Sequence, residues 1–278
     1  MIPDIGFTFE QGYAPGTPDA RQRSPSGPVL GSTIPGMPLK VWLAGEQLDL
    51  QRLAALFSDG DVRVVPDNDE DGRYYLTAVG LDQAHEVNRV YPTVQLLLGW
   101  INGAAKVEIP DFHDVTYAGR YTTANGDQVI QPAAAVLRLR VGVTASAEVR
   151  GPDGAVKPSP QPPAVTRVAL AASNDQVAKV LTLMAGDRNW DDLWKVYETI
   201  RKAVGGTNAL VNQLQWITEG DKKAFRESAN NPDVSGDDAR HAIPTSPTPP
   251  TRTMTIDEGR AFINDLIAKW TDWVIANS

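Results

Sequence analysis

The 278-residue chain contains no cysteine. Disulfide bonds, thiolate nucleophiles, cysteine-based zinc sites and iron–sulfur ligation are therefore excluded. Histidine is scarce as well: His85, His113 and His241 are the three in the chain, and no pair of them has the spacing of metal ligands. The sequence therefore predicts no metal site and no cofactor.

Long apolar runs are also missing. The longest, residues 94–101, is interrupted by Gln95 and Gly99 and is far shorter than the about 20 residues that cross a bilayer. Residues 1–4 carry no basic charge, and no apolar segment of a secretory signal follows them. We therefore expect a cytoplasmic protein without a membrane partner.

Positive charge is in deficit, since 26 Lys and Arg face 34 Asp and Glu, and the net charge is −8. Proteins that bind phosphate backbones generally need clustered Lys and Arg. The composition thus argues against general DNA binding, although it leaves room for a local basic site. The plainest consequence of the acidity is solubility.

Proline and glycine divide the chain into four parts. Residues 1–38 are rich in both and show no hydrophobic period, which predicts an arm that is either disordered or extended over a partner. Residues 39–150 predict an α+β domain, and the proline cluster in residues 151–165 predicts a stiff linker. Residues 166–278 predict a helical bundle, so the expected fold class is α+β with a helical C-terminal domain.

Two hairpins are expected in the α+β region. Asn125-Gly126 should form the turn of the second, because a type I′ turn requires positive φ at both central residues. Asn102-Gly103 is expected to end a helix that begins near residue 81, and Pro92 to start a second helix or to kink the first. Hydrophobic spacing predicts a helix over 48–57 and strands over 39–43, 62–65, 74–77, 115–123, 129–136 and 137–143.

The helical region shows clear start and stop signals. A helix is predicted over 175–184, and a second is expected to begin after Asn189, which can cap it, and to end at Gly205-Gly206. A third is predicted from residue 207 to about 226. Residues 228–253 then read as a long polar connection.

The last helix has the clearest signature in the chain. Thr255 and Glu258 form a capping box, in which each side chain can bond the backbone N–H of the other. An apolar stripe follows at three- and four-residue steps, and this predicts a core helix. The stripe consists of Ile256, Ile263, Leu266, Trp270 and Trp273.

Most of the short motifs that mark common functional sites are absent from the sequence or incomplete in it. Residues 67–72 match the first half of an EF-hand loop, but the twelfth position, which needs a bidentate Glu, is Ala78, so an acidic hairpin tip is expected. No phosphate-binding glycine loop or nucleophile elbow is present. Asp111, His113 and Asp114 read as a solvated polar loop.

Residues 228–242 concentrate polar and charged side chains between two predicted helices. An Arg beside a His can serve phosphate chemistry, because His transfers protons near neutral pH and Arg stabilises developing negative charge. In the alternative, Arg240 pairs with Asp237 or Asp238 and His241 caps a helix, which makes the segment structural. The candidate catalytic residues are Arg240 and His241, and the candidate binding residues are Asn230, Asn231, Asp237 and Asp238.

Residues 190–273, roughly, resemble the end of HEPN-type helical domains. The resemblance rests on an Arg/His loop, a Pro-rich spacer and a final capped helix that ends in Trp. Those domains occur in prokaryotic toxins and defence proteins, and their active members are metal-independent RNases. The family signature places Arg several residues before His, whereas Arg240 directly precedes His241 here. The resemblance implies either an RNase acting through these two residues or a non-catalytic scaffold or dimerisation module.

Three functional hypotheses follow. The first is a non-enzymatic binding, regulatory or scaffold protein with a protein partner or a second copy of itself. The second is a HEPN-type RNase, for which RNA is the partner. The third is an assembly protein whose arm, residues 1–38, attaches to a neighbour.

Overall fold

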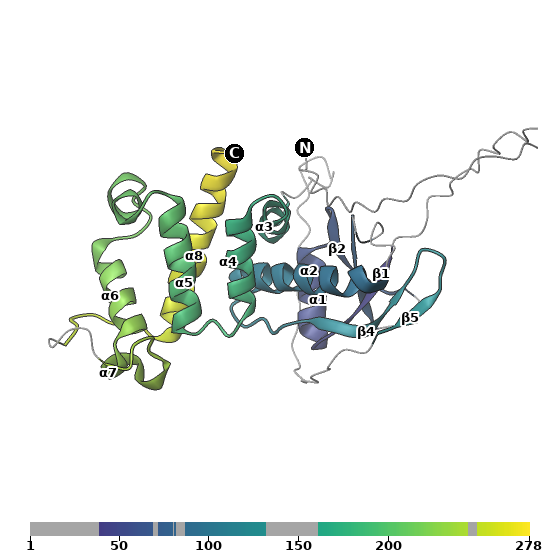
Figure 1. Ribbon diagram of the computed structural model, residues 1–278, viewed down its shortest axis with the longest axis horizontal. Helices are drawn as coiled ribbons and strands as arrows, with labels where there is room; N and C mark the ends of the chain where they lie inside the picture. Colours follow the sequence, from purple (N-terminus) through teal and green to yellow (C-terminus); the bar gives the residue numbers. More distant parts are fainter. Residues whose placement is uncertain (1–38, 69–71, 80, 82–86, 132–160, 244–248) are drawn as a thin grey trace, which may run out of the picture. The chain divides into compact units, whose positions relative to one another are not determined.

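The computed structural model describes residues 39–68, 72–79, 81, 87–131, 161–243 and 249–278. All of them belong to one compact unit, Gly36–Ser278. This unit holds a five-stranded antiparallel sheet, two helices that lie between its strands in the chain, and a series of helices that follows the last strand (Figure 1). The predicted α+β class with a helical C-terminal region is therefore confirmed.

The sheet is assembled from two hairpins and a central strand, in the order β2-β3-β1-β4-β5, with every neighbouring pair antiparallel. The predicted β4–β5 hairpin is present, but its turn is not the predicted type I′ turn: Gly126 has a φ of 89°, whereas Asn125 does not have a positive φ. The Gly126 N–H donates to the Thr123 carbonyl at 2.9 Å, so Ala124 and Asn125 are the central residues of the turn and Gly126 follows them. The predicted strand 137–143 lies outside the described residues. The strands are β1 (Lys40–Ala44), β2 (Val62–Pro66), β3 (Tyr74–Ala78), β4 (Thr116–Thr122) and β5 (Gln128–Ile130).

Helix α2 (Val87–Glu108) runs through Asn102-Gly103, so the predicted stop there is wrong. The Asn102 side chain donates to the Val115 carbonyl and accepts from the Val115 N–H, at 2.9 and 3.1 Å. A Cβ on Gly103 would lie 2.0 Å from the carbonyl oxygen of Leu181. The glycine therefore permits close packing of two helices instead of ending one. Pro92 lies inside α2, and no second helix starts there.

Helices fill the rest of the unit. Asn174, Asn189 and Thr255 cap α4, α5 and α8 through their side chains, and the Thr255–Glu258 capping box is present in full. The α-helices are α1 (Gln47–Leu56), α3 (Pro163–Ala171), α4 (Asp175–Ala185), α5 (Trp190–Ala203), α6 (Glu219–Asn230), α7 (Pro232–Ser235) and α8 (Ile256–Ala276).

The helix predicted over residues 207–226 is interrupted, which corrects that prediction. A π-helical turn, Ala209–Gln213, is followed by Gln215 with a φ of 53°, a left-handed conformation that a continuous helix cannot contain. Thr218 then starts α6 by accepting a hydrogen bond from the Asp221 N–H. The spacing of apolar residues does not reveal this break, because it indicates which residues are buried and not whether the backbone between them is helical.

One hydrophobic core spans the sheet and the helices. Helix α2 packs against both α3 and α4, α4 packs against α5, and α5 packs against α8. In the α8 stripe, Ile263, Leu266 and Trp270 are fully buried. No helix among the described residues is long and apolar enough to cross a membrane.

The structure describes one end of the predicted linker. Helix α3 begins at Pro163, inside the predicted linker, while residues 151–160 and the predicted arm, 1–38, lie outside the described part of the chain. The division into four parts stays a prediction.

Candidate functional site

The predicted Arg240–His241 segment is tied to the helices around it through Arg240. The Arg240 guanidinium donates to Asn230 Oδ1 at 2.9 Å and to Asp191 Oδ1 at 3.4 Å, and its centre lies 5.1 Å from the Trp194 ring centroid. Its backbone N–H donates to the Ala229 carbonyl at 2.9 Å. Arg240 thus joins the segment to α5 and α6.

The other predicted site residues do not gather around Arg240. Asn231 is buried and caps α7, accepting from the Asp233 N–H at 3.1 Å. Asp237 and Asp238 are exposed in a 3₁₀ turn, and His241 is exposed as well. The structure therefore brings Asn230 and Arg240 together, and Arg240 pairs with Asp191 in place of the expected Asp237 or Asp238.

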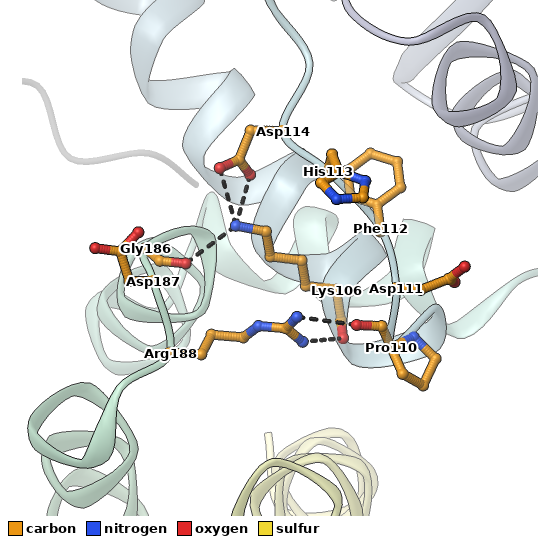
Figure 2. Close-up of a pocket in the computed structure, with 9 residues that line it drawn as sticks. All are labelled: Lys106, Pro110, Asp111, Phe112, His113, Asp114, Gly186, Asp187 and Arg188. Atoms are coloured by element: carbon orange, nitrogen blue, oxygen red, sulfur yellow. Dashed lines mark hydrogen bonds and ion pairs between the residues drawn. The ribbon is translucent and has the colours of Figure 1, made fainter. Parts of the chain in front are cut away.

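A polar cavity of about 330 Å³ lies elsewhere, between the loop that follows α2 and the turn that connects α4 to α5 (Figure 2). The first of these segments is residues 110–114 and the second is residues 186–188. The cavity is lined by Lys106, Pro110, Asp111, Phe112, His113, Asp114, Gly186, Asp187 and Arg188.

Lys106 is buried in the wall of this cavity, with 6% of its surface exposed. Its Nζ donates to the carbonyl oxygens of Ala185 and Gly186, at 2.7 and 3.0 Å, and lies 2.8 Å from Asp114 Oδ1. These contacts use all three donors of an ammonium group. Burial lowers the pKa of Lys106, and Asp114 opposes this shift.

Arg188 is the second buried cation, with 8% of its surface exposed and a φ of 54°. Its guanidinium donates to the carbonyl oxygens of Lys106 and Pro110, both at 3.0 Å, near the C-terminal end of α2 (Figure 2). Burial lowers the pKa of Arg188, and the neighbouring charge of Arg260 lowers it further. Arg260 also donates to the Arg188 and Asp187 carbonyls, at 3.3 Å.

His113 extends from the same loop toward α1. Its Nδ1 lies 3.2 Å from Oδ2 of Asp49, and its backbone N–H donates to the same oxygen at 3.3 Å. Asp49 is fully buried and Glu46 nearly so. One ligand atom from each of Glu46, Asp49 and His113 fits within a mutual distance of 4.8 Å, which makes them a group that can hold a metal ion.

The sequence indicated the loop side of this region and not its buried charged residues. Asp111, His113 and Asp114 form a polar cluster in the sequence, but no sequence pattern connects this cluster with Asp49 or Lys106. Those two residues look like ordinary charged positions on helices, and no local signal marks them as buried. Their apolar neighbours in the sequence are an indirect clue at most: Asp49 stands between Leu48 and Leu50, and Lys106 stands between Ala105 and Val107.

No family model, curated protein or solved structure matches the chain.

Proposed function

We propose that the protein is a non-enzymatic binding protein whose cavity between residues 110–114 and 186–188 takes a small molecule with a carboxylate or phosphate group. The observation that carries the proposal is the pair of buried cations, Lys106 and Arg188, in the wall of that cavity. A cytoplasmic location and a protein partner or second copy remain proposals from the sequence.

The two buried charges in the cavity wall are positive, whereas the three carboxylates of the lining, Asp111, Asp114 and Asp187, are exposed. Among the described residues, Asp114 is the carboxylate that contacts Lys106, and its side chain is 44% exposed. The carboxylates of Asp111 and Asp187 point away from the two cations (Figure 2), and Asp111 lies 3.2 Å from Arg52. Since burial lowers the pKa of both Lys106 and Arg188, a bound anion would offset an electrostatic cost that the protein already bears.

Arg188 is the residue best suited to contact the ligand. A guanidinium carries five N–H donors in a planar fork that matches carboxylate and phosphate oxygens. Two Arg188 contacts, to the Lys106 and Pro110 carbonyls, fix the guanidinium in place. Lys106 has used its donors on the protein, so it contributes charge and not a hydrogen bond.

The lining also favours binding over covalent catalysis. The described residues around the cavity include no Ser, Thr or Tyr, and the chain has no Cys. An activated hydroxyl or thiol nucleophile is therefore missing from this lining. The volume of about 330 Å³ lies at the lower end of the range for small-molecule sites.

The test is a panel of small carboxylates and phosphate esters, measured by thermal shift and by calorimetry. We expect at least one compound to raise the Tm of the wild-type protein, and Arg188→Met to weaken its binding by about 10-fold or more. Arg201→Met, on α5, is the matched control and should bind like the wild type.

Two results would contradict the proposal. One is a wild-type protein that binds no member of the panel at millimolar concentration. The other is an Arg188→Met variant that folds and binds with unchanged affinity. If Arg188→Met does not fold, the wild-type measurement still decides the question.

The RNase hypothesis, by contrast, requires Arg240 and His241 to face a phosphate together. Asp191 already offsets the charge of Arg240, and Trp194 covers one face of its guanidinium. These contacts favour a structural role for Arg240, in line with the binding or scaffold hypothesis.

A further inference from the structure

We propose that Glu46, Asp49 and His113 form a binding site for a divalent transition-metal ion, with Zn²⁺ as the best fit. The inference concerns the side of His113 that faces α1 and does not depend on the proposed anion ligand. It also differs from the prediction, made from histidine spacing alone, that the chain has no metal site.

The three side chains come from places that fix their positions. Glu46 is the N-cap residue of α1 and Asp49 lies in its first turn, three residues further on, so both project near the same end of the helix. His113 lies on the loop that connects α2 to β4. The backbone N–H of His113 donates to Oδ2 of Asp49 at 3.3 Å, which orients that carboxylate toward the imidazole.

The spacing suits a metal ion. Two bonds of about 2.0–2.1 Å to a tetrahedral Zn²⁺ place their ligand atoms about 3.4 Å apart. Nδ1 of His113 and Oδ2 of Asp49 are 3.2 Å apart, and ligand atoms of all three residues lie within 4.8 Å of one another. Small side-chain rotations therefore bring the three to bonding distance.

Two buried carboxylate oxygens of this group lack hydrogen-bond partners among the described residues. Glu46 is 8% exposed, and its Oε2 has no hydrogen-bond partner among the described residues. Its carboxylate also makes no capping hydrogen bond to α1. Asp49 is 0% exposed, and its Oδ1 likewise has no hydrogen-bond partner in the described part of the chain.

Among the described residues, Asp49 forms ion pairs with His113 and Arg52. Nη1 of Arg52 lies 3.7 Å from Oδ1 of Asp49 and 3.2 Å from Oδ1 of Asp111. Arg52 is therefore shared between two carboxylates, while Glu46 adds a third acidic group close by. Buried carboxylates are usually paired or bound to metals, because an isolated buried charge is costly.

The donor types select the ion. One imidazole nitrogen and two carboxylate oxygens suit Zn²⁺, whereas Mg²⁺ and Ca²⁺ prefer all-oxygen sites. Three protein ligands leave a position of a tetrahedral ion open to water.

The experiment is calorimetric titration of chelator-treated full-length protein with Zn²⁺, with Mg²⁺ as the comparison ion. We expect Zn²⁺ to bind at a one-to-one ratio, and Glu46→Gln and His113→Ala to weaken it by about 10-fold or more. His241→Ala, which removes an exposed histidine, and Glu219→Gln, which removes an exposed carboxylate, are the matched controls and should leave binding unchanged.

Thermal stability gives an independent readout. Zn²⁺ should raise the Tm of the wild type and not that of Glu46→Gln. Without metal, Glu46→Gln should be at least as stable as the wild type, because it removes an unpaired buried charge. Co²⁺ bound to the wild type should also give the visible absorption of a four- or five-coordinate ion, and His113→Ala should lose it.

The proposal is wrong if the wild type does not bind Zn²⁺, or if His113→Ala and Glu46→Gln bind it as the wild type does. In the first case Asp49 and His113 form a hydrogen-bonded pair beside Arg52, and Glu46 is a buried carboxylate near them. In the second, the ion binds to other residues. The anion-panel result with Arg188→Met is independent of both outcomes.

Discussion

Lys106 shows how much of this structure depends on single buried polar groups. Lys106 belongs to α2, yet its ammonium group caps the C-terminal end of α4 by donating hydrogen bonds to the Ala185 and Gly186 carbonyls. It also anchors Asp114, on the loop after α2. One side chain thus holds two segments about 80 residues apart in the chain.

We expect Lys106→Met to lower the free energy of unfolding by about 2–4 kcal/mol, because it leaves two carbonyls and a carboxylate without their donor. Urea denaturation followed by circular dichroism would measure this change. Lys179→Met, at an exposed position of α4, is the control and should change stability by less than about 0.5 kcal/mol. Equal stability of the two variants would show that the Lys106 contacts contribute nothing.

At this scale the sequence predicts local contacts and misses distant ones. Asn189 and Thr255 were identified as caps, because the groups that a cap bonds lie within three residues of it. Ala185, His113 and Asp191, which bond Lys106, Asp49 and Arg240 respectively, lie far from them in the chain and become their neighbours only after folding. No pattern of spacing encodes them.

Among the elements, α2 is the one whose packing was least predictable. Asn102-Gly103 has the composition of a helix end, and yet it lies in the interior of a 22-residue helix. Packing against α4 and the two hydrogen bonds with Val115 outweigh the local signal. A glycine chosen for close approach and a glycine chosen for a stop look the same in the sequence.

Two glycines of α2 provide a matched test of this packing. A Cβ on Gly103 would lie 2.0 Å from the Leu181 carbonyl oxygen, whereas a Cβ on Gly99 would meet nothing within 4 Å. We expect Gly103→Ala to destabilise the fold by about 3 kcal/mol or more, and Gly99→Ala to be neutral or stabilising by up to about 1 kcal/mol. Chemical denaturation of both variants would measure the difference, and similar values would contradict the close contact.

The capping box of α8 has a predictable pH dependence. Hydrogen bonds from the Thr255 backbone N–H and hydroxyl lower the pKa of Glu258 below its ordinary 4.5. A lowered carboxyl pKa stabilises the fold above the unfolded-state value, and this stability is lost as the pH falls through the folded-state value. We therefore expect Glu258→Gln to be less stable than the wild type at pH 7 and nearly equal to it at about pH 3. Thermal unfolding at both pH values would show this, and a difference that does not depend on pH would argue against it.

For the whole molecule, the contacts of Arg240 lead to an expectation about activity. Because that guanidinium is bound to Asp191 and Asn230, we expect the purified protein to leave a labelled panel of single-stranded and structured RNAs intact. Gel electrophoresis would follow the panel with and without the His241→Ala substitution. Cleavage by the wild type that His241→Ala abolishes would restore the HEPN-type RNase hypothesis.

The fold class was predictable because period-2 and period-3.6 patterns alternate in the N-terminal half of the chain, whereas the period is helical throughout the C-terminal half. The five strands that the structure describes, and the α1, α4, α5 and α8 helices, follow from those patterns and from their turn and capping residues. The joint core of the two halves was not predictable, since periodicity identifies a buried face without identifying what covers it. The candidate sites were unpredictable for the same reason, because they form between segments whose contacts the sequence pattern does not identify.

The contacts of α2 with both α3 and α4 have a consequence for anyone who divides this protein into pieces. A cut between residues 151 and 160 would leave the apolar face of α2 on one fragment and the faces of α3 and α4 that cover it on the other. Neither fragment would be an autonomous module for transplantation into a chimera. Co-expressed, the two would carry complementary surfaces and act as the halves of a split protein.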